Sequence, residues 1–409
     1  MAIELKHFLL VPIIMMFGVS PVYYRYYGVD LQLILTGVSG LIFFSKFVVG
    51  VKSFNLGKKL NVAALLIFVL PFFSLLWAQD KKIALEGLIP YSVVVYFLFV
   101  VNGLRSLTLR DLLLIVSIAV MLVAVAGVCV SYLFPGLGVQ QTGQYIGDAW
   151  IGLFDHKNSY SRMLGVGILA SITYLCFFEG YRLLLTLNIF FLFGCLWLSR
   201  SGTVLIAVTA LAILVLSMKG GGGRRIVKYF PLICCALVFL GPIVVIFDQL
   251  LALVLDVLGR AEYERSTIEV RAHLWGEVIQ GVIARPIFGY GLGGFWGSDG
   301  RVLSVAGDTS LEWVPMQAHN GYLELMLSFG LVGLGCFIFY LRELNRLVNR
   351  VRGVSYLKGT VIFTMFYLII NNTYAAFFTQ IALPWFMVAS VVFVESREWS
   401  DWIDGRARE

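Results

Sequence analysis

The stretch Gln317–Gly335 has the sequence QAHNGYLELMLSFGLVGLG, in which a polar start is followed by a long apolar run. The apolar residues from Leu323 onward are continuous rather than alternating, which favours a helix over a strand. Inside a bilayer, backbone polar groups have to be satisfied within their own segment, and this again favours a helix. The stretch therefore predicts a membrane-spanning helix with His319 at its polar start.

The rest of the chain has the same character. Hydrophobic residues make up 59% of the 409 residues, charged residues make up 13%, and the mean hydropathy is +0.88. A soluble domain carries about 25% charged residues, so most of this chain is expected to face lipid or other apolar helices. We predict an all-α polytopic membrane protein with about 12 transmembrane helices, because runs of about 20 apolar residues can cross a bilayer.

The predicted spans are separated by short polar or charged connections. They lie near residues 8–24, 29–51, 61–78, 88–103, 111–134, 162–178, 181–198, 202–218, 229–247, 320–341, 356–374 and 376–394.

Lysine and arginine are distributed unevenly between the two sides of these spans. One side holds Lys52, Lys58, Lys59, Arg105, Arg110, Lys219, Arg224, Arg225, Lys228, Arg342, Arg346, Arg350, Arg352 and Lys358. Cytoplasmic loops carry such an excess, so this pattern predicts that both termini are cytoplasmic. The net charge of +7 is then mostly a signal of topology, and nothing in it calls for a nucleic-acid partner.

Two segments on the opposite side are too long to be simple turns. The first runs from Pro135 to Tyr160, and the second from Asp248 to Ala318. The chain is accordingly divided into an N-terminal transmembrane bundle (1–247), a loop domain (248–319) and C-terminal transmembrane helices with a tail (320–409). Within the loop, residues 270–284 place Leu274, Val278 and Val282 on one stripe, which is typical of an interfacial amphipathic helix.

His319 is the main candidate for chemistry. Histidine titrates near neutral pH, so a neutral imidazole at the edge of a membrane can act as a general base on a sugar hydroxyl. The alternative is that His319 is a helix cap or a surface residue.

Two arginines suggest an anionic substrate. Arg200 lies in LWLSRSGT between two apolar runs, and Arg271 lies in IEVRAHLW near the start of the stripe. A guanidinium binds phosphate oxygens in a bidentate manner, so the pair could hold a lipid diphosphate. Arg200 could instead extend its side chain to the membrane interface.

Two further runs contain polar residues or glycine. WIGLFDHKNSYSR, residues 150–162, brings Lys157, Asn158 and Arg162 to the start of a span, either as a second cationic wall of the same site or as a helix start with interface charges. PIFGYGLGGFW, residues 286–296, has neither the strand nor the GK[ST] ending of a nucleotide-binding loop, so its glycines indicate a tight turn. The acids are scattered, and no metal site is predicted.

Taken together, these motifs resemble the O-antigen ligase and polysaccharide polymerase superfamily. The resemblance rests on SRSG, the arginine that opens the long loop, P-x-x-G-x-G-x-G, and AHNGYLELMLSFGLVGL, and it covers about residues 150–335. GLFDHKNSYSR is similar to the HKN segment of the exopolysaccharide-polymerase branch.

The resemblance implies an inverting glycosyltransferase with a GT-C-like fold at the periplasmic face of the bacterial inner membrane. Its donor would be a glycan on undecaprenyl diphosphate, with no cofactor, nucleotide sugar or metal. Arg200 and Arg271 match the arginines that bind the diphosphate, and His319 matches the histidine that activates the acceptor. Lys157, Asn158, Arg162 and Asn320 are possible further substrate contacts.

The acceptor distinguishes the alternatives. A lipid-linked repeat would make the protein a polysaccharide polymerase, which the HKN run slightly favours, and a lipid A-core would make it an O-antigen ligase. A protein-glycosylating relative is a third alternative. A transporter or flippase for the same lipid-linked glycan is the alternative from another class, but no internal repeat supports it.

Overall fold

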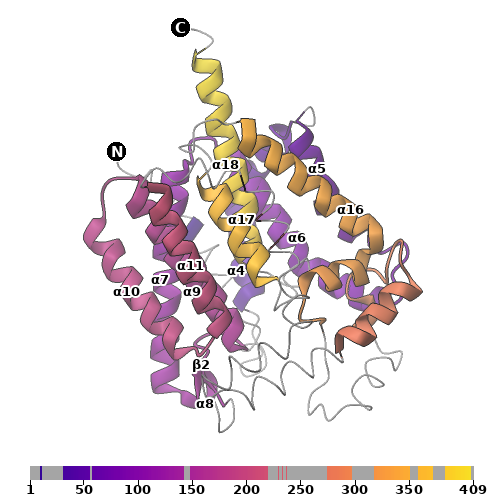
Figure 1. Ribbon diagram of the computed structural model, residues 1–409, viewed down its shortest axis with the longest axis horizontal. Helices are drawn as coiled ribbons and strands as arrows, with labels where there is room; N and C mark the ends of the chain where they lie inside the picture. The colour runs from indigo at the N-terminus through magenta and orange to yellow at the C-terminus, as the bar shows by residue number, and fades with distance from the viewer. Residues whose placement is uncertain are drawn as a thin grey trace.

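The protein is described from a computed structural model (Figure 1) that covers residues 10–11, 31–55, 58–141, 148–219, 229, 233, 236, 274–296, 317–350, 358–371 and 383–406. The predicted all-α class is confirmed: over these residues the structure is mostly helical, and its strands form one short antiparallel ribbon. The elements are α4 (Leu31–Lys52), α5 (Lys59–Ser74), α6 (Lys81–Gly103), α7 (Leu109–Leu133), α8 (Pro135–Gly138), β1 (Val139–Gln140), β2 (Ala149–Trp150), α9 (Lys157–Phe177), α10 (Arg182–Leu198), α11 (Gly202–Ser217), η2 (Gly294–Trp296), α16 (Gly321–Arg350), α17 (Lys358–Ile370) and α18 (Leu383–Arg406).

These helices overlap the predicted spans, although α6 begins before its span, at Lys81, and α16 and α18 extend beyond theirs, to Arg350 and Arg406. The spans at 8–24 and 229–247 lie almost wholly outside the described residues. Within the described part, four helices are long and apolar enough to cross a membrane: α6, α7, α9 and most of α16. Shorter apolar helices include α5, α10, α11 and most of α17. The protein is therefore a helical membrane protein.

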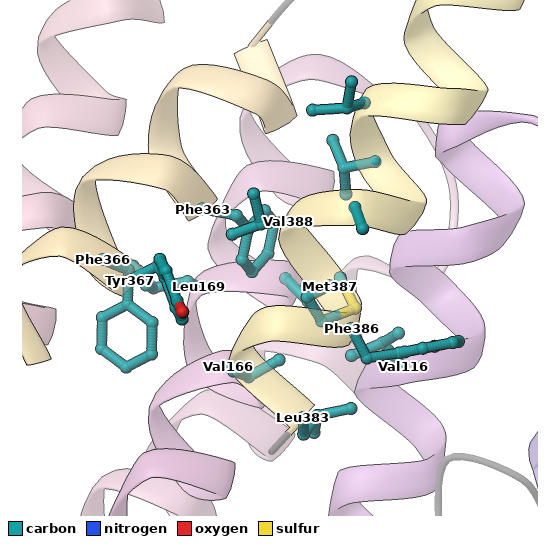
Figure 2. Packing of buried hydrophobic residues seen from close by; sticks show 14 of the residues in the cluster. Val116, Val166, Leu169, Phe363, Phe366, Tyr367, Leu383, Phe386, Met387 and Val388 are labelled. Atoms are coloured by element: carbon teal, nitrogen blue, oxygen red, sulfur yellow. The ribbon is translucent and has the colours of Figure 1, made fainter. Parts of the chain in front are cut away.

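Helix α9 lies at the centre of the bundle and packs against α7, α10, α11, α17 and α18. Figure 2 shows its Val166 and Leu169 among side chains of α7, α17 and α18. Glycines allow the close approach, because a Cβ at Gly165 would lie 2.8 Å from the Phe366 ring and one at Gly167 would lie 2.5 Å from Val120. Small residues are the usual means of bringing helices together in membranes.

One end of the bundle is held together by α18. Glu395 accepts hydrogen bonds from the Gly359 and Thr360 amides at the start of α17, and Glu398 accepts one from the Leu109 amide at the start of α7. Arg397 donates to the Leu107 carbonyl, just after the end of α6. Carboxylates at helix N-termini and cations at C-termini both complement the helix dipole.

Helix α16 was predicted as a membrane span, and its length and composition agree with this prediction, but the helix is not continuous. Gly330, with φ 60° and ψ −151°, breaks it into two parts. The carbonyls of Leu327 and Ser328 accept hydrogen bonds from the amides of Tyr290 and Gly291, at 2.9 Å each. On the other side of the break, the Leu331 amide donates to the Pro286 carbonyl and the Val332 amide to the Ile287 carbonyl. The glycine-rich turn thus satisfies backbone groups that a break in a membrane helix would leave without partners.

The same turn is also held from its other side. The Gln79 amide donates to the Tyr290 carbonyl at 3.0 Å, and the Trp77 indole donates to the Phe288 carbonyl at 2.8 Å. The prediction of a tight turn is confirmed, since Gly289, Gly291 and Gly293 all have positive φ. The turn is not simply a surface feature, because it is wedged between α16 and the connection from α5 to α6.

The predicted amphipathic helix is present as Leu274–Ala284. Its stripe of Leu274, Val278 and Val282 is buried, but the expectation that this stripe faces a membrane interface was wrong. It packs instead into a second hydrophobic cluster with aromatic residues of the loop and with α16: Trp275, Tyr290, Phe295, Trp296, Ala318 and Leu327. The opposite face carries exposed Ile279 and Ile283.

Candidate functional site

Two of the motifs found in the sequence lie side by side. The hydroxyls of Ser161 and Ser199 are 2.8 Å apart, and the Ser201 hydroxyl donates to Asn158 Oδ1 at 3.1 Å. The HKN run at the start of α9 is therefore joined to the SRSG turn between α10 and α11. Because both motifs begin a helix, their backbone amides point toward this end of the bundle.

The start of α9 is built by its own polar residues. His156 is the N-cap, and its Nδ1 accepts a hydrogen bond from the Asn158 amide at 3.1 Å. Burial lowers the pKa of His156 to about 4, so the imidazole is neutral at neutral pH, as this hydrogen bond requires. Lys157 is half-buried, and its amide donates to the Gln140 side chain beside the β-ribbon.

Arg162 is buried, and its guanidinium folds back on its own helix. Its Nε donates to the Asn158 carbonyl and its Nη2 to the Ser159 hydroxyl, both at 3.0 Å. These bonds support the first turn of α9. They agree better with the interpretation of this run as a helix start than with its interpretation as a cationic wall of a substrate site.

Arg200 lies in the short turn between α10 and α11, and its side chain is exposed. Its backbone is in the left-handed region, with φ 54°. The other predicted diphosphate ligand, Arg271, lies outside the described residues.

His319 lies two residues before the first residue of α16, and the residue before it, Ala318, is fixed through both its amide and its carbonyl. The Ala318 amide donates to Glu324 Oε2 and the Ala318 carbonyl accepts from the Trp275 indole, both at 2.8 Å. His319 itself is half-buried, with φ 48°.

Asn320, predicted as a possible substrate contact, caps α16. Its Oδ1 accepts hydrogen bonds from the amides of Tyr322 and Leu323 at 3.0 and 3.2 Å. The side-chain nitrogen has no partner within the described residues. The next amide, of Gly321, donates to the Asn371 carbonyl at 2.7 Å, which ties the start of α16 to the end of α17.

The hydrogen bond between Gly321 and Asn371 helps to place His319 at the same end of the bundle as the HKN run and the SRSG turn. Phe366, near the end of α17, packs on Gly165, in the first half of α9, and Gly165 also lies next to Val204 at the start of α11. A helix rises 1.5 Å per residue, so Asn371 lies about level with the first turns of α9 and α11. Figure 1 shows the beginning of α9 and the segment leading into α16 in its lower half, away from the projecting end of α18.

Backbone strain coincides with the candidates. Three non-glycine residues have positive φ in the part of the chain that the structure describes: Tyr181, Arg200 and His319. A non-glycine residue in such a conformation costs roughly 1–3 kcal/mol and is found preferentially at functional sites. Two of these three residues had been selected from the sequence for chemical reasons alone.

One residue at this site was not assigned a role from the sequence. Glu324 is 1% exposed, and it accepts hydrogen bonds from the Trp296 indole and the Ala318 amide, both at 2.8 Å. A carboxylate in the first turn of an apolar span was the available signal, since such residues are rarely without purpose. Its partners lie elsewhere in the chain, so the sequence alone could not pair them.

The fold and this end of the bundle define a polytopic helical membrane protein with a histidine, an arginine and a buried glutamate at helix starts. Comparison with known families adds that residues 187–338 match the family described as O-Antigen ligase. The resemblance predicted from the sequence is confirmed over this segment, which includes Arg200 and His319.

Relatives from Rickettsia agree with this match. Proteins of Rickettsia typhi (strain ATCC VR-144 / Wilmington) and Rickettsia prowazekii (strain Madrid E), both provisionally named polysaccharide ligases, are 30% and 31% identical over 94 residues. Each match covers 21% of this chain and 23% of the relative. The comparisons therefore support a ligase- or polymerase-type function.

Proposed function

We propose that this protein is an inverting, metal-independent glycosyltransferase of the bacterial inner membrane. It transfers a glycan from undecaprenyl diphosphate to an acceptor sugar hydroxyl at the periplasmic face. The site would lie where the loop domain (248–319) meets the transmembrane parts (1–247 and 320–409).

The mechanism is a single displacement. Arg200 and Arg271 bind the diphosphate, with Lys157, Asn158, Arg162 and Asn320 as further candidate contacts. The His319 imidazole accepts the proton of the acceptor hydroxyl, whose oxygen forms a bond to the anomeric carbon. The bond from that carbon to the phosphate oxygen breaks, and undecaprenyl diphosphate leaves with the electron pair. The arginines then stabilise the charge that develops on the leaving group, which is where electrostatic catalysis contributes most.

One observation carries this proposal. His319 and Arg200 both have strained, left-handed backbones at helix starts on one end of the bundle. Strained backbones of this kind are found preferentially at functional sites, and a base and a cation at these two positions distinguish them from Tyr181.

Two acceptors remain as candidates, each favoured by one observation. The HKN run at 156–158 favours a polymerase that extends a lipid-linked repeat. The names of the family and of the Rickettsia relatives favour a ligase, whose proposed acceptor is a lipid A-core. A strain lacking the gene separates them: unpolymerised single repeats would indicate a polymerase. Full-length polymer left on undecaprenyl diphosphate, beside bare core, would indicate a ligase.

The proposal predicts that His319→Asn abolishes transfer when it is returned to that strain. Asparagine tolerates the left-handed conformation well, so the variant should fold while lacking a base. Loss of a general base costs about 10²–10⁴-fold in rate. The measurement is the product that the deletion strain lacks, which is polymer for a polymerase and polymer on the lipid A-core for a ligase, together with the amount of variant protein in membranes.

Tyr181→Ala is the matched control. Tyr181 has the same left-handed conformation as Arg200, with φ 54°, but it lies between α9 and α10, at the end of the bundle opposite the candidate site. It should keep the wild-type amount of that product. A wild-type amount of the product in the His319→Asn strain would refute the proposed role of His319.

A further inference from the structure

Glu324 has a geometry unlike that of an interface charge or a proton acceptor. It is almost fully buried, at 1% exposed, and each carboxylate oxygen accepts one hydrogen bond of 2.8 Å. A general base needs access to the proton that it removes. The burial of Glu324 restricts this access, and its bonds to two protein N–H groups fit a residue that acts on its neighbours rather than on substrate.

Its two hydrogen-bond donors lie in two separate segments of the loop domain (248–319). The Trp296 indole belongs to η2, at the end of the glycine-rich turn, and the Ala318 amide directly precedes His319. The carboxylate therefore ties the glycine-rich turn to the peptide that carries the histidine. The glycine-rich turn itself is fixed by main-chain hydrogen bonds to both parts of the broken α16.

The Ala318 peptide is held on its other face as well. Its carbonyl accepts a 2.8 Å hydrogen bond from the Trp275 indole, which belongs to the loop helix Leu274–Ala284. Immediately after His319, Asn320 caps α16 through two backbone amides. The backbone on both sides of His319 is thus fixed by buried partners, and this can hold its left-handed conformation against the strain.

We propose that Glu324 is the positioning residue for His319. Its carboxylate sets the direction of the imidazole through the Ala318 amide and the Trp296 indole, without touching substrate. This inference rests on the proposed role of His319 as the base. An error of about 1 Å in the position of a catalytic group can lower the rate on the order of 100-fold, so loss of Glu324 should act on turnover and not on donor binding.

The test compares two buried glutamates with equivalent bonding. In Glu324→Gln, one of the two N–H donors faces an amide NH₂ and loses its acceptor. Glu395→Gln makes the same change at the other end of the bundle, where Glu395 is 0% exposed and accepts from the amides of Gly359 and Thr360. Both changes leave a buried donor unpaired and should lower the melting temperature to a similar extent.

Kinetics would be measured on full-length protein in nanodiscs. The donor is the undecaprenyl-linked glycan extracted from the deletion strain, and the acceptor is the same pool or the lipid A-core of that strain. Glu324→Gln should lower kcat on the order of 100-fold with the donor KM within about twofold, and Glu395→Gln should leave both constants near wild type. Trp275→Phe keeps an aromatic side chain, although a smaller one, and removes the donor to the Ala318 carbonyl, so it should also lower kcat at unchanged KM.

The outcomes separate the two proposals. If His319→Asn is active in this assay, the proposed function fails. If His319→Asn is inactive while Glu324→Gln keeps its kcat, or loses donor binding instead, only the positioning role is overturned. If Glu324→Gln does not fold, the kcat of Trp275→Phe becomes the test. A wild-type kcat in Trp275→Phe then overturns the positioning role.

Discussion

Gly330 shows how much a single residue contributes to this fold. Its φ of 60° and ψ of −151° fall in a region that only glycine adopts readily. A Cβ there would lie 2.3 Å from the Ile287 carbonyl oxygen, inside the glycine-rich turn. Gly330→Ala should therefore destabilise the protein by roughly 3 kcal/mol, seen as a lower melting temperature in detergent.

Gly335 offers the control in the same helix. A Cβ at that position meets nothing within 4 Å, so Gly335→Ala should leave the melting temperature unchanged or slightly raised. Equal melting temperatures for the two alanine variants would contradict the role given to the break in α16.

At the residue scale, the sequence could predict those candidates whose chemistry is unusual for their place. His319 and Arg200 lie at the edges of apolar runs, where an ionisable side chain is energetically costly and usually functional. The bonds of Glu324 could not be predicted, because Trp296 lies 28 residues away in the chain. The cap formed by Asn320 was a pattern that could have been recognised from an asparagine before an apolar run.

The start of α9 carries a prediction at the scale of the element. The pKa of His156 lies at about 4 in the folded protein, mainly because of burial, against an ordinary value of 6.5. As the pH falls through 6.5, the unfolded chain takes up a proton that the folded protein takes up only near 4. Stability should therefore be constant above about pH 6.5 and fall by up to roughly 3 kcal/mol toward pH 4.

His156→Asn separates the cap from the titration. Asparagine is a strong N-cap that does not titrate in this range, so the variant should melt like the wild type at about pH 7.5 and lose less stability at about pH 5. Melting curves of both proteins at the two pH values are the measurement. An identical fall in both proteins would show that His156 is not the group responsible.

The helices were predicted from the local sequence pattern. What the pattern did not predict depends on contacts with segments that lie far away in the sequence. The apolar run of α16 gives no sign of a break, since the groups that satisfy it come from residues 286–291. The stripe on Leu274–Ala284 was recognised, but a stripe does not say whether it meets lipid or protein. Here Phe295 and Trp296 cover it.

At the scale of the whole molecule, Arg110, one of the charges assigned to one side from the sequence, lies at the end of the bundle that α18 holds together. Arg110, at the start of α7, donates to the Tyr174 hydroxyl and the Glu179 carbonyl at the end of α9. The acids and the arginine of α18 close the same end. The candidate residues His319 and Arg200 lie at the other end, so the direction of the bundle in the membrane decides which compartment the site faces.

This direction can be tested with single cysteines placed at exposed positions of opposite ends. Asp155→Cys lies just before α9, beside the candidate site, and Arg105→Cys lies in the connection from α6 to α7. Both would be made in a chain whose 6 native cysteines are replaced. If the lysine- and arginine-rich end is cytoplasmic, a membrane-impermeant maleimide should label Asp155→Cys in intact spheroplasts, and Arg105→Cys only after the membrane is opened. The reverse pattern would put the site in the cytoplasm. A periplasmic glycosyl transfer would then be impossible, whatever the activity of the His319 variants.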